Sequence, residues 1–361
     1  MIKKILVIDD SALMRRVLCD IINSDDRFEV VDTATNGVEG FTKIISLEPD
    51  AVVLDVYMPQ MTGLQLLEEM QKSGVKANVL MASTKTTDGA QETIRALELG
   101  AVDFITKPER AFDIDNEAFK KKFLGLLWVV SNANPMLALH RIKNRSENKT
   151  SSLSDAIAKK IPSEHIKAKG KKIVAIASST GGPRALQEVI PKLPKNLAAP
   201  VLLVQHMPGG FTKSLAERLN EDSEITVEEA SENVRLEKGH VYIAQGGKHM
   251  KAIKGNMFYH LELTDEPARE GVKPCANYMY ESLINSDFDE VVCVVLTGMG
   301  CDGTEGIVNL SNSKKLHVIA QDEATSTVYG MPKAVAEAGK VNEIVPLNQV
   351  ADRITREVGV Q

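Results

Sequence analysis

The sequence predicts two α/β domains in tandem, each with a doubly wound and mostly parallel sheet. Short apolar stretches of strand length alternate with amphipathic stretches of helix length in both halves of the chain. A polar segment rich in serine and lysine separates the halves, and 361 residues exceed one typical core. We therefore expect a first domain over residues 1–130, a linker over 131–168 and a second domain over 169–361.

Composition excludes several classes of protein. The net charge of −6 argues against a nucleic-acid-binding surface as the main function. The cysteines are Cys19, Cys275, Cys293 and Cys301, and none has the CxxC spacing of a zinc site or belongs to a disulfide framework. We expect reduced thiols in a cytoplasmic protein. The apolar N-terminal run is a first strand and not a signal peptide, and no run approaches the ~20 residues that insert into a membrane.

The first domain alternates five strands and five helices. The expected strands cover residues 5–8, 28–32, 51–54, 79–82 and 103–105. The expected helices cover residues 13–22, 37–46, 64–72, 89–99 and 117–130. Ser11 has the side chain and the position of an N-cap for the first of these helices. The order predicts a parallel sheet with helices on both faces.

Polar side chains gather at the carboxyl ends of these strands, which form the functional edge of such a sheet. They are Asp9, Asp10, Asp55, Ser83 and Lys107. Three neighbouring carboxylates repel one another unless a cation joins them, and Mg²⁺ prefers oxygen ligands. A lysine beside them is suited to the anionic oxygens of a phosphoryl group. The alternative is a set of surface carboxylates with an incidental lysine, which five residues at four strand ends disfavour.

The motifs VIDDS, LDVYMPQMTG, MAS and ITKP occur in this order and resemble a response-regulator receiver domain, which has a flavodoxin-like fold. The resemblance covers about the first 125 residues. It implies that Asp55 accepts a phosphoryl group from a histidine kinase and that Asp9, Asp10 and Asp55 bind Mg²⁺. It also implies that Ser83 and Lys107 contact the phosphoryl oxygens.

The connecting segment is polar, with a short helix expected over residues 153–160. Its lysines and arginines are expected to be solvated, although basic residues can also contact a partner.

The second domain repeats the alternation and adds a hairpin. The expected strands cover residues 173–177, 200–204, 227–229, 241–244, 290–296 and 316–320, with a β-hairpin from 249–253 and 257–263. One expected helix begins after Pro183, and another follows Gly303. The others cover residues 211–219, 278–285 and 333–338. This half is expected to be a second doubly wound sheet.

Residues 173–184, IVAIASSTGGPR, predict a buried strand that passes through a tight glycine turn into a helix. Hydroxyl groups at such a turn face backbone N–H groups. This arrangement suits a nucleophile beside an oxyanion site, a phosphate cradle, or an ordinary turn that happens to contain serine and glycine.

Two other strand ends carry His206 and Asp302. Together with a serine at 178 or 179, they supply a nucleophile, a general base and an orienting carboxylate. Spacing alone leaves alternatives open. His206 can be a structural histidine, Asp302 can cap the next helix, and His249, which follows a Gly-Gly pair, is the strongest rival base.

The segments IASSTGGP, VQHMPGGFTKSLAERL, YIAQGGKHM, LTGMGCDGTEG and IAQDEATSTVYGMP resemble the catalytic domain of chemotaxis protein-glutamate methylesterases. The resemblance implies hydrolysis of glutamate methyl esters on chemoreceptors, with release of methanol, and deamidation of receptor glutamines. It assigns Ser179 as nucleophile, His206 as base and Asp302 as carboxylate, with the backbone at Thr180 and Met299 near the oxyanion. It implies no cofactor for the esterase.

The family also implies regulation and partners. The unphosphorylated receiver is expected to cover the active site until Asp55 is phosphorylated, and the partners are the kinase and the receptors. Residues 272–275, VKPC, replace a common HRPS, which we expect to alter contacts with the receptor. Two alternatives remain: a phospho-regulated adaptor without turnover, and a nucleotide-binding domain, which lacks the GxxxxGK[ST] and GxGxxG patterns.

Overall fold

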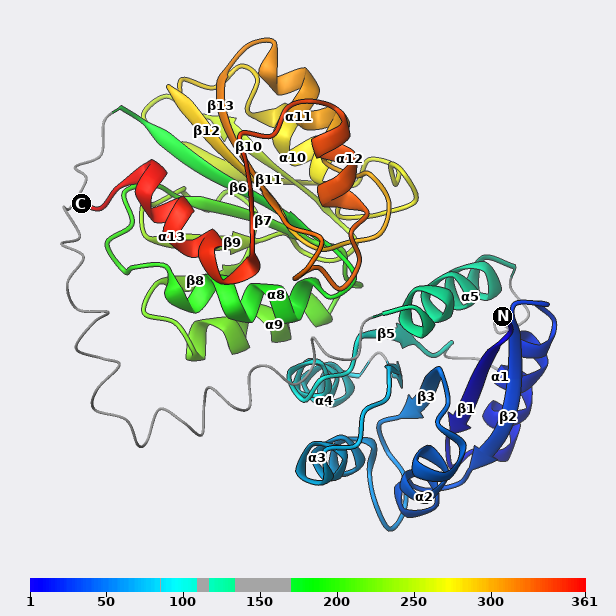
Figure 1. Cartoon of the computed structure of the whole chain (residues 1–361). Helices are drawn as coiled ribbons and strands as arrows, with labels where there is room; N and C mark the ends of the chain where they lie inside the picture. The colour runs from blue at the N-terminus through cyan, green and yellow to red at the C-terminus, as the bar shows by residue number, and fades with distance from the viewer. Residues whose placement is uncertain (85, 109–116, 134–169) are drawn as a thin grey trace, which may run out of the picture. The chain divides into compact units, whose positions relative to one another are not determined.

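The computed structural model describes residues 1–84, 86–108, 117–133 and 170–361, and the chain divides into two compact units, Met1–Ile157 and Ala158–Gln361 (Figure 1). The two units are described separately. Most of the expected linker over 131–168, including its expected helix over 153–160, lies outside the described residues. No helix among the described residues is long and apolar enough to cross a membrane.

The first unit has one parallel sheet in the order β2-β1-β3-β4-β5. Its strands are β1 (Lys3–Ile8), β2 (Phe28–Ala34), β3 (Ala51–Asp55), β4 (Val79–Ser83) and β5 (Asp103–Thr106). Its helices are α1 (Ala12–Asn23), α2 (Gly37–Leu47), α3 (Gly63–Ser73), α4 (Thr87–Glu98) and α5 (Glu117–Ser131). The strand order is that of flavodoxin-like folds, which confirms the prediction for this domain.

Helix placement follows from the apolar stripes of the sequence. The fully buried Ile5 and Val7 of β1 pack in one core with Ile22 of α1 and Phe123 and Leu127 of α5. Burying one such side chain stabilises the fold by about 1.5–3 kcal/mol. Ser11 caps α1 as expected, because its hydroxyl accepts the Met14 N–H at 3.3 Å. The polar ends of β1, β3 and β5 are thereby held at one edge of the sheet.

The second unit has a seven-stranded parallel sheet in the order β14-β13-β12-β6-β7-β9-β8. Its strands are β6 (Lys172–Ser178), β7 (Val201–Gln205), β8 (Thr226–Glu229), β9 (His240–Ile243), β12 (Glu290–Val295), β13 (Lys315–Gln321) and β14 (Glu343–Val345). The added hairpin is also present, as the antiparallel pair β10 (His249–Lys254) and β11 (Tyr259–Thr264).

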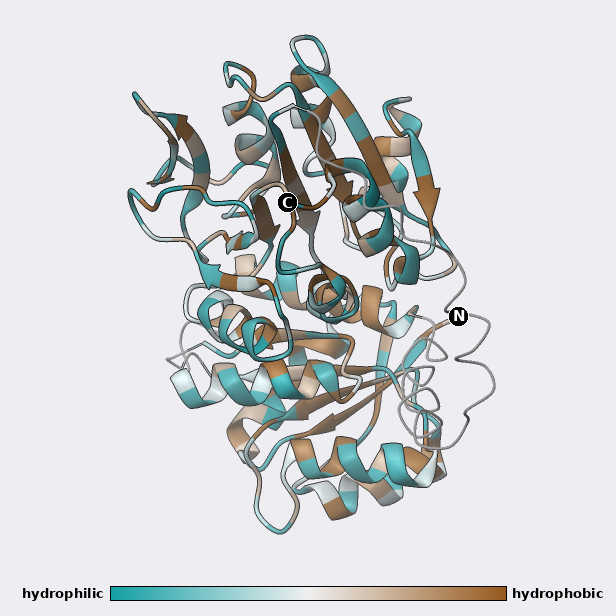
Figure 2. Ribbon diagram, turned by 90° about the vertical axis from the view of Figure 1, so that its left-hand side faces the viewer, coloured by the Kyte–Doolittle hydropathy of each residue, from teal (hydrophilic) through white to brown (hydrophobic). Residues whose placement is uncertain are grey.

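Helices cover both faces of this sheet (Figure 1). One face carries α8 (Gly182–Val189), α9 (Phe211–Glu221) and α13 (Leu347–Val358), and the other carries α10 (Ala276–Ser282), α11 (Thr304–Ser311) and α12 (Met331–Glu337). The central strands are largely hydrophobic, whereas the edge strand β8 is mostly hydrophilic and the helices carry hydrophilic residues outward (Figure 2). Strand β6 is buried on both faces, as expected for a central parallel strand, and Ala175 and Ala177 pack toward Tyr280 of α10.

The elements expected from the sequence end at residue 338 and omit the last strand and helix, β14 and α13. Strand β14 has only three residues, too few for a periodic signal. Helix α13 does carry one, because Val350, Ala351, Ile354 and Val358 form a buried stripe. Helix α10 begins at Ala276, two residues before the expected start. This difference matters for the site, since the first turn of α10 contacts Asp302.

Candidate functional site

Three adjacent strands of the second unit end at the same place. Strand β6 lies between β12 and β7, so Ser179, His206 and the loop after β12 emerge together. Backbone hydrogen bonds join these ends: Ser179 N–H donates to Thr297 O at 3.0 Å, and His206 N–H donates to Ser178 O at 3.1 Å. The parallel register thus brings the predicted serine and histidine to one edge.

Ser178 and Ser179 lie in different environments. Ser178 is fully buried, and its hydroxyl donates to Oε1 of Gln205 at 2.7 Å. Ser179 is only half-buried, and within the described part of the chain its hydroxyl makes no hydrogen bond, with His206 or with any other residue. Hydrogen bonds between a nucleophile and its base are often long before substrate binds.

The turn after the serines requires its glycines. Gly181 has a φ of +74°, and a Cβ there would lie 2.5 Å from Thr327. A Cβ on Gly182 would lie 1.9 Å from Oε1 of Gln205, the atom that accepts the Ser178 hydroxyl. The amide of Gln205 also donates to Ser179 O at 2.9 Å. The buried Gln205 side chain therefore holds the turn from within, a role that the sequence prediction did not assign.

His206 and Asp302 form a close and sheltered pair. Nε2 of His206 lies 2.7 Å from Oδ2 of Asp302, and the side chains are 9% and 3% exposed. With Nε2 donating to the carboxylate, the neutral ring presents Nδ1 as an acceptor. That is the protonation state of a general base held by a carboxylate.

The Asp302 carboxylate accepts three further hydrogen bonds. The Cys275 thiol donates to Oδ1 at 3.0 Å, Ala276 N–H to Oδ2 at 2.6 Å, and Asn277 N–H to Oδ1 at 3.0 Å. Burial acts to raise the pKa of Asp302, but His206 and these donors outweigh it and hold the pKa below its usual range. The carboxylate is therefore ionised near neutral pH. Cys275, the last residue of the VKPC segment that replaces the common HRPS, therefore contacts the Asp302 carboxylate directly.

Two backbone donors near the serines have no partner. Among the described residues, no acceptor is found for the N–H groups of Thr180 and Met299. The Ser179 N–H is occupied by Thr297 O, and the Gly298 N–H by Val328 O at 3.0 Å. Gly298 also lets the β12 loop approach the serine, since a Cβ there would lie 2.7 Å from the Ser179 Cβ. Free N–H groups beside a serine are suited to an oxyanion.

The rival base His249 is occupied elsewhere. It is fully buried; its Nδ1 accepts the Cys275 N–H at 3.2 Å, and its Nε2 lies 3.2 Å from Pro267 O. Burial lowers the pKa of His249, so the ring is neutral. With both nitrogens engaged, it supports the segment before α10 and is not placed to take a serine proton.

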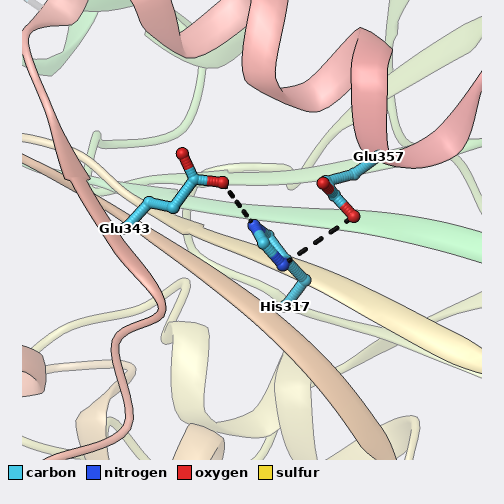
Figure 3. Close-up of side chains that lie close together, drawn as sticks. All are labelled: His317, Glu343 and Glu357. Atoms are coloured by element: carbon cyan, nitrogen blue, oxygen red, sulfur yellow. Dashed lines mark hydrogen bonds and ion pairs between the residues drawn. The ribbon is translucent and has the colours of Figure 1, made fainter.

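His317 belongs to a separate cluster near the start of β13 (Figure 3). Its Nε2 lies 2.9 Å from Glu343 Oε1 and its Nδ1 3.8 Å from Glu357 Oε2. Arg353 approaches Glu343 as well, at 3.4 Å. The cluster has the residue types of a metal site. Each ring nitrogen already faces a carboxylate, however, and the strand ends that carry Ser179 and His206 are at the other edge of the sheet.

In the first unit, Asp9, Asp10 and Asp55 offer carboxylate oxygens within 4.8 Å of one another. Nζ of Lys107 lies 2.7 Å from both Asp9 and Asp55. Burial raises the pKa of Asp55, and the Lys107 ammonium offsets only part of that effect. Three clustered carboxylates with one lysine fit a hard divalent cation, since further positive charge would relieve their repulsion.

The last predicted residue of this edge, Ser83, is turned toward α4. Its hydroxyl lies 2.7 Å from the Thr93 hydroxyl and 3.1 Å from Gly89 O. Of the five predicted residues of the first domain, the structure joins Asp9, Asp10, Asp55 and Lys107 in one cluster and bonds Ser83 to its neighbouring helix.

Two families match the chain. The CheB methylesterase family matches residues 174–354, and the response regulator receiver domain matches residues 5–118. A protein-glutamate methylesterase/protein-glutamine glutaminase of Syntrophomonas wolfei is 41% identical over 98% of this chain and 98% of its own length. One of Bacillus subtilis is 40% identical over 98% and 97%.

A solved structure is similar to the second unit. The crystal structure of the Thermotoga maritima CheB methylesterase catalytic domain is 40% identical, with a TM-score of 0.50, and covers 52% of this chain and 99% of that one.

Proposed function

Since the chain belongs to the CheB methylesterase family and carries a response regulator receiver domain, we propose that it is a phosphorylation-activated hydrolase of chemotaxis receptors. It removes methyl esters from glutamate γ-carboxyl groups and releases methanol, and it deamidates receptor glutamines. The receiver takes residues 1–130, a linker 131–168 and the catalytic domain 169–361. A cytoplasmic location follows from these partners.

The observation that carries the proposal is the His206–Asp302 pair at 2.7 Å beside a serine whose hydroxyl is unengaged. In the proposed reaction, Ser179 Oγ attacks the ester carbonyl while His206 accepts its proton. Asp302 stabilises the resulting imidazolium. The N–H groups of Thr180 and Met299 bind the oxyanion, and one such donor contributes about 10²–10³ in rate.

The tetrahedral intermediate then collapses. The C–O bond to the methoxy group breaks, and the imidazolium of His206 gives its proton to the leaving oxygen, so that methanol departs. Water, deprotonated by the same imidazole, hydrolyses the acyl-serine and regenerates Ser179. With a glutamine substrate the leaving group is ammonia, and the acyl-enzyme is the same. No cofactor enters these steps.

The receiver controls this activity in the proposed mechanism. A histidine kinase supplies the phosphoryl group to Asp55. Asp9, Asp10 and Asp55 would hold Mg²⁺, which when bound would supply positive charge to offset that of the phosphoryl oxygens. Lys107 pairs with one phosphoryl oxygen. To donate to another phosphoryl oxygen, the Ser83 hydroxyl must give up the hydrogen bond that it donates to Gly89 O. Phosphorylation releases the catalytic domain from cover by the receiver.

Methanol release from methylated receptor membranes tests the proposal. The full chain with acetyl phosphate and Mg²⁺ should release methanol faster than the unphosphorylated chain, and a fragment of residues 167–361 should be active without phosphodonor. A chain that binds receptors but releases no methanol in either form would be the adaptor instead. Methanol release that does not change on phosphorylation would contradict the proposed regulation but not the proposed esterase activity.

A further inference from the structure

Asn277 and Asp302 cap each other's helices. The Asp302 carboxylate accepts the N–H groups of Ala276 and Asn277, the first two residues of α10, at 2.6 and 3.0 Å. In return, Oδ1 of Asn277 accepts the N–H groups of Gly303 and Gly306, at the start of α11, at 3.0 and 2.7 Å. Helix α11 begins two residues after Asp302. Each side chain thus satisfies donors that the other helix leaves unpaired.

The Asp302 and Asn277 side chains that form these hydrogen bonds are both buried. Asn277 is fully buried, and its Nδ2 donates to Oε1 of Glu270 at 2.7 Å. A Cβ on Gly306 would lie 2.8 Å from the Asn277 Cα, so the two helices approach backbone to backbone. Unpaired donors left in this space would be costly, because no room remains for the chain to turn them outward.

We propose that Asn277 is a positioning residue for the catalytic carboxylate. By capping α11, it fixes the backbone from which Asp302 projects, and its own N–H fixes Oδ1. The orientation of the carboxylate toward Nε2 of His206 then depends on the Asn277 side chain, which itself lies outside the Ser-His-Asp set. This inference rests on the proposed esterase mechanism.

The pH dependence of activity can report this role. Besides His206, the titratable groups of the described residues that face Asp302 are Cys275, Cys301 and Tyr280. The Glu270 carboxylate faces the Asn277 amide at 2.7 Å. Burial raises the pKa of Cys275 and of Tyr280, and the bond to Glu270 raises the pKa of Cys301 to about 11. All three are neutral between pH 5 and 8. A shift of the acid limb in that range therefore indicates a change at the His206–Asp302 pair.

Asn277→Ala removes the acceptor of two buried N–H groups, and we expect α11 and Asp302 to shift. A displaced carboxylate stabilises the imidazolium less, so the acid limb of activity moves to lower pH. The plateau kcat falls about 10- to 100-fold, the size of effect that a 1 Å misplacement produces. Asn277→Asp keeps the acceptor for Gly303 and Gly306 but replaces the amide that donates to Glu270 with a second carboxylate oxygen. The added negative charge stabilises the imidazolium, so its acid limb should lie at higher pH than the wild type.

The matched control is Asn309→Ala. Asn309 lies on the same helix, α11, but its amide donates to Glu281 at 2.8 Å and not to the Asp302 segment. It should keep the wild-type acid limb and a kcat within about twofold, as expected for a half-buried site away from the chemistry.

The experiment uses the full chain with acetyl phosphate and two readouts across pH 5–9: methanol release, and the rate of covalent modification by a fluorophosphonate, which needs no receptor. Opposite shifts of the acid limb in Asn277→Ala and Asn277→Asp support the proposal. An unmoved limb in both, with only a lower melting temperature, overturns it. If Asn277→Ala does not fold, Asn277→Asp decides alone: an acid limb at higher pH supports the proposal, and an unmoved limb overturns it. A wild type that reacts with fluorophosphonate but releases no methanol would refute the proposed function while leaving this test intact.

Discussion

The hydroxyl of Ser178 donates a hydrogen bond to Oε1 of Gln205, at 2.7 Å inside the core. This bond distinguishes Ser178 from the neighbouring Ser179. Ser178 is committed to holding the turn, whereas the Ser179 hydroxyl remains free within the described residues. The residue pattern alone left the choice between 178 and 179 open. The hydrogen bond favours Ser179 as the nucleophile.

Replacing each serine separately should therefore give unequal losses. Ser179→Ala is expected to lower methanol release by about 10⁴-fold or more, as loss of a nucleophile does. Ser178→Ala leaves Oε1 of Gln205 unpaired and should cost about 1–3 kcal/mol of folding stability, with activity of the folded protein within about tenfold. Initial rates and thermal melts of both variants check this. Equal losses of activity would contradict the assignment.

The two histidines with carboxylate partners should also behave differently. His206→Ala removes the proposed base, and kcat should fall by about 10³-fold or more. His317→Ala breaks the half-exposed contacts with Glu343 and Glu357 (Figure 3), which contribute about 0–1 kcal/mol to stability, and should leave kcat unchanged. Methanol release by the two variants decides. A large loss in His317→Ala would show that its cluster reaches the active site.

Acid should destabilise the catalytic domain partly through Asp302. Its pKa in the folded state lies below the usual value, because His206 and three other donors outweigh the effect of burial. A depressed carboxyl pKa contributes stability above the unfolded pKa of about 3.9, and that contribution disappears as pH falls through the folded value. Melting temperatures of the wild type and Asp302→Asn should converge below about pH 4. A constant difference from pH 7 to pH 3 would contradict this.

Gly298 should be sensitive to a single methyl group. A Cβ there would lie 2.7 Å from the Ser179 Cβ and 2.3 Å from Sδ of Met331, so Gly298→Ala must displace the serine or the loop. We expect kcat to fall about 100-fold, the loss that a misplaced reacting group produces. Gly125→Ala is the control, because a Cβ there meets nothing within 4 Å. Rates measured at saturating receptor test this; wild-type kcat in Gly298→Ala would show that the site relaxes.

Asp55 should be the residue among the clustered aspartates that carries the phosphoryl group. Asp55→Asn should take no label from acetyl phosphate and should keep only the basal esterase rate. Asp32→Asn on β2, which removes an exposed ion pair with Lys43 of α2, should label normally. Intact-mass spectrometry detects the added phosphoryl group. Label that persists in Asp55→Asn would place the acceptor at Asp9 or Asp10.

The sequence was sufficient for the architecture, because buried parallel strands leave continuous apolar runs and end in polar residues. It carries no periodic signal for β14, which has only three residues. It does carry the apolar stripe of α13, but the expected elements did not include that helix. Within the candidate site, Ser179, His206 and Asp302 could be named from strand ends and family motifs. Gln205 and Asn277 could not, since the contacts that define their roles, Gln205 to Ser179 and Asn277 to Gly303, each join residues 26 positions apart. Their burial as polar side chains becomes visible only in three dimensions.

The central claim is that Ser179 is the nucleophile, and a covalent probe tests it most directly. The full chain would be treated with a fluorophosphonate, digested, and the modified residue located by mass spectrometry. We expect one adduct, on Ser179, formed in step with the loss of methanol release and absent after His206→Ala. An adduct on Ser178 or on the exposed Cys301, or full inactivation with Ser179 unmodified, would contradict it.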